Sequence, residues 1–181
     1  MDNLKEIITD YLNAENTDYA IMINGEWGCG KTYYILNTLF PIIKNITSPK
    51  KENGKKNTEI SKLYEPVYIS LYGISNIDNI YSKILSSLFP FMQKINNIEG
   101  LTNDERKAIE SYIGIPQNKV LFFDDLERIS DNLDINEVLG CLNTYAEHNK
   151  LKIIIVCNDK KVEEKYNGFK EKTIRFTYNY Q

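Results

Sequence analysis

The residues best suited to chemistry form one glycine-rich run near the start of the chain. The run is Gly25-Glu26-Trp27-Gly28-Cys29-Gly30-Lys31-Thr32, which fits the spacing G-x-x-x-x-G-K-[ST]. Its glycines let the backbone curl so that successive N–H groups point inward, which suits the oxygen atoms of a phosphate chain. The lysine can reach the outer phosphates, and the threonine hydroxyl can bind Mg²⁺. The run therefore predicts a loop that holds a nucleoside triphosphate with Mg²⁺.

The sequence of this loop indicates that the ligand carries phosphates, but it does not indicate which base the ligand has. We expect ATP, with GTP as the alternative, because the loop contacts phosphates and leaves the base to less patterned residues. Lys31 is the expected catalytic lysine, and Thr32 is an expected Mg²⁺ ligand. The residues expected to contact the nucleotide are Gly25, Glu26, Trp27, Gly28, Cys29, Gly30, Lys31, Thr32 and Tyr33.

A pair of adjacent carboxylates follows the apolar run 119–123. Asp124 is the expected carboxylate on the Mg²⁺ side, and its alternative role is that of a turn or helix-capping aspartate. Asp125 is placed to orient or deprotonate the attacking water, with Glu127 as a competing base. Adjacent side chains leave the backbone in different directions, so we expect one carboxylate on the metal and the other facing water.

Three more polar positions are candidates for the same site. Asn158 follows the apolar run 151–157 and is expected to hydrogen-bond the γ-phosphate or the attacking water, unless it only forms a turn. Arg128 and Arg175 are candidates for neutralising charge, within this chain or across to a neighbouring one, and otherwise are surface or ion-paired arginines. Trp27 is expected to pack over the loop, with stacking on the nucleotide base as its alternative role.

These side chains need a framework that brings them together. Continuous apolar runs alternate with amphipathic stretches, which predicts an α/β fold with a mainly parallel sheet of about five strands between two layers of helices. Ligands in such sheets bind beyond the carboxyl ends of the strands, where the polar residues above fall. Strands are expected at 19–24, 66–71, 119–123, 151–157 and 173–178, and helices at 2–14, 33–40, 77–88 and from an N-cap at Asp134.

The chain is expected to form a single domain over residues 1–181. Residues 47–61 lack periodicity and predict a flexible loop, and residues 89–118 predict a helical insert broken by prolines and glycines. Pro41 is expected to stop or kink the helix that follows the glycine-rich loop.

Composition excludes several classes of protein. Hydrophobic residues make up 42% and charged residues 26% of the chain, which are ordinary values for a folded domain. There is no apolar run of about 18 residues, no nucleic-acid motif, and the net charge is only −3. Three cysteines without a CxxC pair and a single histidine argue against a zinc site or a disulfide framework. We expect a cytoplasmic protein without a membrane segment.

Taken together, the glycine-rich run and the stretch 121–128 resemble the KAP family of P-loop NTPases, in the STAND-like branch of the additional-strand class. The most specific points are the tryptophan inside the loop and the run Asp124-Asp125-Leu126-Glu127-Arg128, while Cys29 replaces the serine usual in the family. The resemblance covers roughly residues 19–178. It implies an ATPase that switches a larger assembly in bacterial defence against phage or in signalling, with a protein partner or self-association.

The same resemblance implies features that this sequence is expected to lack. Many such proteins carry membrane helices inside the nucleotide domain, and many continue into a helical lid, which we expect to be absent or truncated here. Two other functions remain as alternatives. One is a nucleotide-binding switch with little turnover of its own. The other is a small-molecule kinase, which would need an acceptor pocket that only the stretch 89–118 has room to form.

Overall fold

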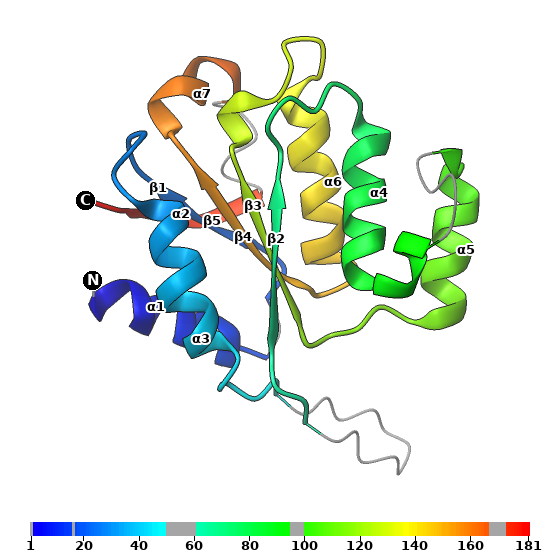
Figure 1. The fold of residues 1–181 in the computed structure, drawn as a ribbon, viewed down its shortest axis with the longest axis horizontal. Helices are drawn as coiled ribbons and strands as arrows, with labels where there is room; N and C mark the ends of the chain where they lie inside the picture. Colours follow the sequence, from blue (N-terminus) through cyan, green and yellow to red (C-terminus); the bar gives the residue numbers. More distant parts are fainter. Residues whose placement is uncertain (1, 16, 50–60, 95–99, 167–172) are drawn as a thin grey trace.

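A parallel β-sheet forms the centre of the molecule in the computed structural model (Figure 1). The structure describes residues 2–15, 17–49, 61–94, 100–166 and 173–181. The sheet has five strands in the order β2-β3-β4-β1-β5, and every neighbouring pair is parallel. The predicted α/β fold is thereby confirmed. The strands are β1 (Ala20–Asn24), β2 (Glu65–Ser70), β3 (Lys119–Asp124), β4 (Lys152–Cys157) and β5 (Ile174–Asn179).

Helices pack against both faces of this sheet, and Figure 1 shows α1 to α3 on one side and α4 and α6 on the other. Helix α5 lies farther out, beyond α4. The helices are α1 (Asp2–Asn13), α2 (Lys31–Tyr34), η1 (Ile35–Leu39), α3 (Phe40–Ile43), α4 (Ile77–Leu88), η2 (Pro90–Lys94), α5 (Asn103–Ile113), η4 (Leu126–Arg128), α6 (Ile135–Glu147) and α7 (Asp159–Tyr166).

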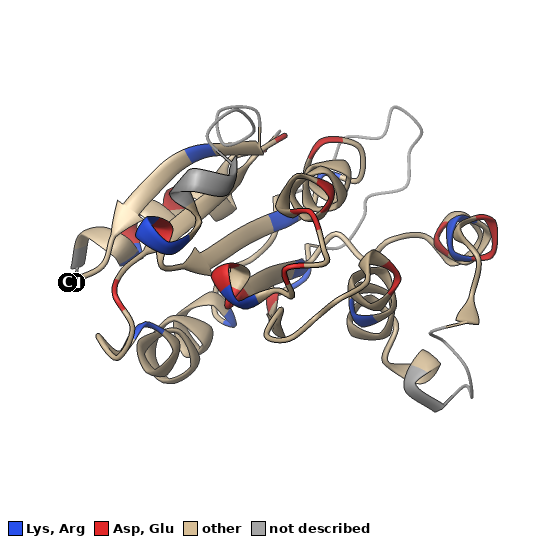
Figure 2. Ribbon diagram, turned by 90° about the horizontal axis from the view of Figure 1, so that it is seen from above, with Lys and Arg blue, Asp and Glu red and all other residues tan. Residues whose placement is uncertain are grey.

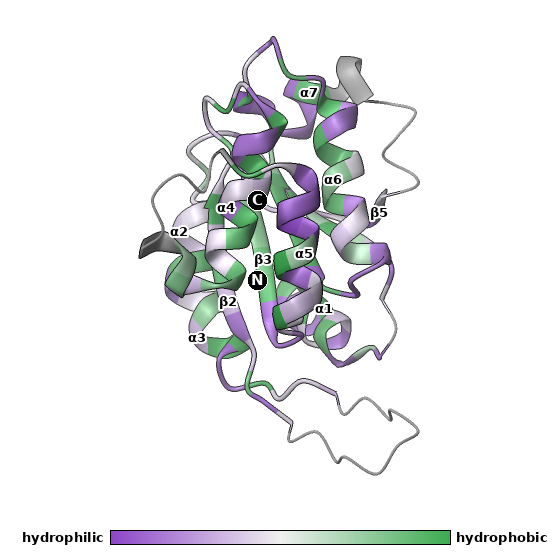
Figure 3. Cartoon of the chain, turned by 90° about the vertical axis from the view of Figure 1, so that its right-hand side faces the viewer, coloured by the Kyte–Doolittle hydropathy of each residue, from purple (hydrophilic) through white to green (hydrophobic). Residues whose placement is uncertain are grey.

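Alternate residues of the three central strands β3, β4 and β1 enter two separate cores, as the period of a strand requires. In β3, Leu121 and Phe123 pack with α4 and α6, whereas Val120 and Phe122 pack with α1 and the α2–α3 helix. Figure 3 shows β3 coloured as hydrophobic and enclosed between helices. Full burial of one such side chain contributes about 1.5–3 kcal/mol. The continuous apolar runs of the sequence therefore follow from a sheet that is covered on both faces.

The helix after the glycine-rich loop differs from its prediction. It begins at Lys31 and continues past Pro41 to Ile43. The segment directly before the proline, Ile35–Leu39, is π-helical. Its wider turn relieves the clash that a proline ring causes in a regular α-helix, so Pro41 does not stop the helix.

The remaining predicted elements agree with the structure, which adds the short helix η4 and the helix α7. Asp134 caps α6 by accepting a hydrogen bond from the Asn136 backbone N–H at 2.9 Å, as expected. The described part of the insert 89–118 holds η2 and α5, while residues 50–60 of the expected loop lie outside the described residues. Helix α7 was not predicted. No described helix combines the length and the apolar character that crossing a membrane requires.

Candidate functional site

The polar residues singled out in the sequence converge at the carboxyl end of the sheet. The glycine-rich loop joins β1 to α2, and the Gly25 N–H donates to the Cys157 carbonyl oxygen at the end of β4 (3.1 Å). Asp124 is the last residue of β3, and Asn158 directly follows β4. Figure 2 looks onto this end of the molecule and shows acidic and basic segments there. The parallel sheet order therefore brings the three segments together.

Three glycines shape the loop for different reasons. Gly28 and Gly30 have φ angles of 79° and 91°, in the left-handed region that other residues rarely adopt. At Gly25 the constraint is space, because an added Cβ would lie 2.9 Å from the Tyr180 carbonyl oxygen. The three glycines thus allow the loop to stay curled. Its N–H groups then lie beside the first turn of α2, where they can bind an anion.

Lys31 lies buried beneath the loop and bridges its backbone. Its Nζ donates to the carbonyl oxygens of Gly25 (2.6 Å) and Glu26 (2.9 Å). This places a positive charge against the curled backbone, where phosphate oxygens would gather. A second link runs from the loop to α7, because the Lys160 Nζ pairs with a Glu26 carboxylate oxygen at 2.9 Å and lowers the pKa of that glutamate.

The residues expected to hold Mg²⁺ are in direct contact. The Thr32 hydroxyl donates to Asp124 Oδ2 at 2.7 Å, although the two residues are 92 positions apart in the chain. Asp124 is buried, and the Tyr68 hydroxyl donates to the same oxygen at 2.9 Å. Burial and the Asp124 charge together raise the pKa of Tyr68, so the phenol stays a hydrogen-bond donor. A hydroxyl beside a buried carboxylate is a donor set that suits Mg²⁺.

Tyr68 is a site residue that sequence reasoning missed. It lies in β2, and its hydroxyl reaches Asp124 because β2 lies beside β3. The sequence showed a tyrosine in a predicted strand but no sign of which strand would be the neighbour of β3.

Asp125 has a backbone conformation and surroundings unlike those of Asp124. Its φ is 63°, in the left-handed region, whereas Asp124 is the last residue of the extended strand β3. One carboxylate oxygen accepts a hydrogen bond from the Ser70 hydroxyl (3.1 Å), and the other lies 3.4 Å from Arg128 Nε. Burial raises the pKa of Asp125, and the charge of Asp124 raises it further. The two carboxylates thus have different partners, Thr32 and Tyr68 for Asp124 and Ser70 and Arg128 for Asp125.

Glu127 contacts the loop through the tryptophan. Its Oε1 accepts a hydrogen bond from Trp27 Nε1 at 2.6 Å. Its Oε2 is buried and has no hydrogen-bond partner among the described residues. A shielded carboxylate oxygen without a partner can still accept a hydrogen bond, for example from a water molecule.

Asn158 is buried beside the loop and lines a cavity of about 340 Å³. Asn158 therefore lies next to the glycine-rich loop. Among the described residues, its side chain makes no hydrogen bond to the loop. Arg175 lies elsewhere, near the amino end of β5, with its Cζ 4.9 Å from the Tyr19 ring centre. The cavity is lined by Asn24, Gly25, Glu26, Cys29, Asn158, Lys160, Asn179, Tyr180 and Gln181.

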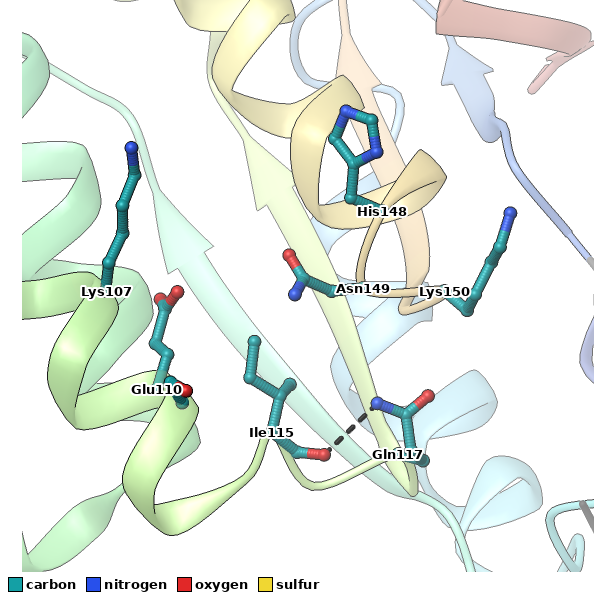
Figure 4. Close-up of a pocket in the computed structure, with 8 residues that line it drawn as sticks. Lys107, Glu110, Ile115, Gln117, His148, Asn149 and Lys150 are labelled. Atoms are coloured by element: carbon teal, nitrogen blue, oxygen red, sulfur yellow. Dashed lines mark hydrogen bonds between the residues drawn. The ribbon is translucent and has the colours of Figure 1, made fainter. Parts of the chain in front are cut away.

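A second cavity, of about 420 Å³, lies at the opposite end of the sheet between α5 and the turn after α6 (Figure 4). Its residues come from α5, from the segment before β3 and from the turn before β4, so the loop takes no part in it. Within the described ranges, no three His, Cys, Asp or Glu side chains cluster as a metal site. The cavity is lined by Lys107, Glu110, Ser111, Ile115, Gln117, His148, Asn149 and Lys150.

Solved structures with a similar fold include proteins from two organisms. The Aeropyrum pernix ORC2 protein, in its ADPNP–ADP complexes, has a TM-score of 0.63 and 17% identity, covering 98% of this chain and 47% of that one. CDC6P from Pyrobaculum aerophilum has a TM-score of 0.60 and 14% identity, covering 99% of this chain and 43% of that one. The chain thus spans less than half the length of either protein, and at these identities the likeness concerns the fold.

Comparison of the sequence with known protein families identifies the family of this chain. No curated protein matches the sequence. The KAP family P-loop domain matches it over residues 1–44 and 34–173, a span that contains the glycine-rich loop, the two carboxylates at the end of β3 and Asn158. The chain therefore belongs to the KAP family of P-loop domains, a family of nucleotide-binding NTPases.

Proposed function

We propose that this domain binds Mg-ATP and hydrolyses it, and that its nucleotide state switches the conformation of a larger assembly. The contact between the Thr32 hydroxyl and the buried Asp124 carboxylate carries the proposal. It joins the end of the glycine-rich loop, which follows β1, to the end of β3, which lies beyond β4 in the sheet, and this is the pairing that a Mg-nucleotide needs. The family resemblance supports a setting in bacterial defence against phage or in signalling.

Each residue has a defined task in this proposal. The loop N–H groups and Lys31 bind the phosphates, while Thr32 and Asp124 hold Mg²⁺. When bound, Mg²⁺ supplies charge neutralisation on the phosphates. Asp125 orients the attacking water and accepts its proton, and the Asn158 amide donates a hydrogen bond toward the γ-phosphate.

Glu127 competes with Asp125 for the task of handling water. Both oxygens of Asp125 are engaged, by Ser70 and by Arg128, whereas Oε2 of Glu127 has no partner among the described residues. Asp125 is favoured by its position directly after the Mg²⁺-side carboxylate, so we assign it the role and test both residues.

The test measures nucleotide binding and hydrolysis, with ATP and with GTP, for the parent and three variants. Lys31→Ala is expected to lose nucleotide binding. Asp125→Asn is expected to bind ATP like the parent but to turn it over about 100-fold more slowly or worse. Glu127→Gln is expected to keep most of its turnover. The opposite ranking of the last two variants would assign the base to Glu127, and unchanged binding by Lys31→Ala would contradict the site.

A nucleotide-binding switch with little turnover is the second candidate function. It is favoured by the engagement of both Asp125 oxygens, because that carboxylate must leave a partner before it can accept a proton from water. Tight binding of Mg-ATP by the parent without measurable hydrolysis would select the switch over the ATPase.

A further inference from the structure

The Trp27 side chain joins the glycine-rich loop to the turn that follows β3. Its indole N–H donates to Glu127 (2.6 Å), and the Arg128 guanidinium carbon lies 4.8 Å from its ring centre. The Lys161 ammonium lies 5.5 Å from the same ring. Two neighbours in η4 and one in α7 thus contact a single loop residue that is about half exposed.

Arg128, which lies over the Trp27 ring, also contacts Asp125. Its Nε lies 3.4 Å from Asp125 Oδ1, and its guanidinium also lies 5.8 Å from the Tyr72 ring centre. A guanidinium that stacks on an aromatic face keeps its N–H groups, which lie in its plane, free to donate. Trp27 and Tyr72 therefore fix Arg128 in a position from which it holds one oxygen of Asp125.

Asp125 needs such external support. Its left-handed backbone conformation is uncommon for a residue other than glycine and persists where the surroundings enforce it. Ser70 holds one of its oxygens from β2, and Arg128 holds the other from η4. A change at the Trp27 ring would therefore alter one of two supports of the Asp125 side chain.

We propose that Trp27 is a positioning residue that couples the glycine-rich loop to Asp125, by holding Arg128 against its ring and Glu127 on its indole N–H. The inference rests on the proposed function, in which the loop binds phosphates and Asp125 handles water. Movement of the loop around a nucleotide is then transmitted to Asp125 through one side chain, and not only through the sheet.

The test compares variants that remove the ring, the guanidinium or both. Trp27→Leu and Arg128→Ala are each expected to lower kcat about fivefold, with less than about a twofold change in the Kd for Mg-ATP. Trp27→Phe keeps a ring and is expected to restore kcat to within about twofold of the parent. The double variant is expected to be no slower than either single variant, because both remove the same contact.

Arg175→Ala is the matched control, because Arg175 also lies over an aromatic ring, that of Tyr19, but at the amino end of β5. It is expected to leave kcat unchanged. Full kcat in Trp27→Leu, additive losses in the double variant, or a loss confined to the Kd would each overturn the proposal. Absence of nucleotide binding by the parent would instead overturn the proposed function.

A second readout does not depend on turnover. Trp27 is the only tryptophan of the chain, so fluorescence excited at the long-wavelength edge where tryptophan absorbs and tyrosine does not reports on its ring alone. Arg128→Ala is expected to change the emission intensity or maximum, and Arg175→Ala is expected to leave both unchanged. Identical emission from the parent and Arg128→Ala would overturn the proposal even in a protein that hydrolyses no ATP.

Discussion

At the scale of single residues, position 25 requires glycine because there is no room for a side chain. A Cβ there would meet the Tyr180 carbonyl oxygen at 2.9 Å, and a backbone atom cannot swing aside as a flexible side chain can. Gly25→Ala is expected to lower the free energy of unfolding by about 1–3 kcal/mol and to weaken ATP binding. Urea denaturation and calorimetric titration measure the two effects.

Gly140 provides the matched control for this prediction. It lies inside α6, and an added Cβ there meets nothing within 4 Å. Gly140→Ala is expected to raise the free energy of unfolding by about 0.5–1 kcal/mol, because alanine favours the helix. Equal stability of Gly25→Ala and the parent would contradict the spatial argument.

Cys29 is the accessible thiol of the site. It is partly exposed, whereas Cys141 and Cys157 are buried, and its Sγ lies 3.9 Å from Lys31 Nζ. Alkylation with N-ethylmaleimide is expected to modify Cys29 first and to block nucleotide binding, because the added group fills space beside Lys31. Mass spectrometry counts the modified thiols, and Cys29→Ser removes the sensitivity. Full ATP binding after complete modification of Cys29 would refute this expectation.

At the scale of elements, helix α5 offers two glutamates with opposite pH behaviour. Burial raises the pKa of Glu110 above 4.5, so the folded protein binds its proton more tightly than the unfolded chain does. Its contribution to stability therefore falls as pH rises from about 4.5 through the folded pKa. Glu110→Gln removes this decline, and its stability relative to the parent is expected to rise over that pH range.

Glu105 supplies the control of opposite sign on the same helix. Hydrogen bonds from Thr102 lower the pKa of Glu105, so its contribution is present above 4.5 and is lost as pH falls through the folded pKa. Glu105→Gln is expected to lose stability relative to the parent at neutral pH and to approach it in acid. Thermal denaturation between pH 3 and pH 8 measures both variants. Parallel pH curves for Glu110→Gln and the parent would be inconsistent with a raised pKa.

Elements also show what the sequence can and cannot predict. Strands 119–123 and 151–157 were placed to within one residue of β3 and β4, because buried parallel strands are continuous apolar runs. Helix α7 was missed because its sequence, DKKVEEKY, is almost wholly polar and shows no apolar stripe. The π-helical turn before Pro41 was missed because hydrophobic periodicity does not distinguish it from an α-helix.

At the scale of the whole molecule, the site depends on the order of the strands. Motif spacing predicted the glycine-rich loop and the carboxylates, and the parallel sheet implied that they would meet at one edge. The contacts of Tyr68 with Asp124 and of Trp27 with Glu127 join residues 56 and 100 positions apart in the chain. No local pattern records such pairs, because they depend on which strands become neighbours and on how side chains pack.

The central claim is that Thr32 and Asp124 form the Mg²⁺ side of a nucleotide site. The most direct test is calorimetric titration of the parent and of Asp124→Asn with ATP, in Mg²⁺ and again with EDTA. We expect one ATP per chain for the parent in Mg²⁺, and binding at least about tenfold weaker after either Mg²⁺ removal or the Asp124→Asn change. Equal affinity under all these conditions would contradict it.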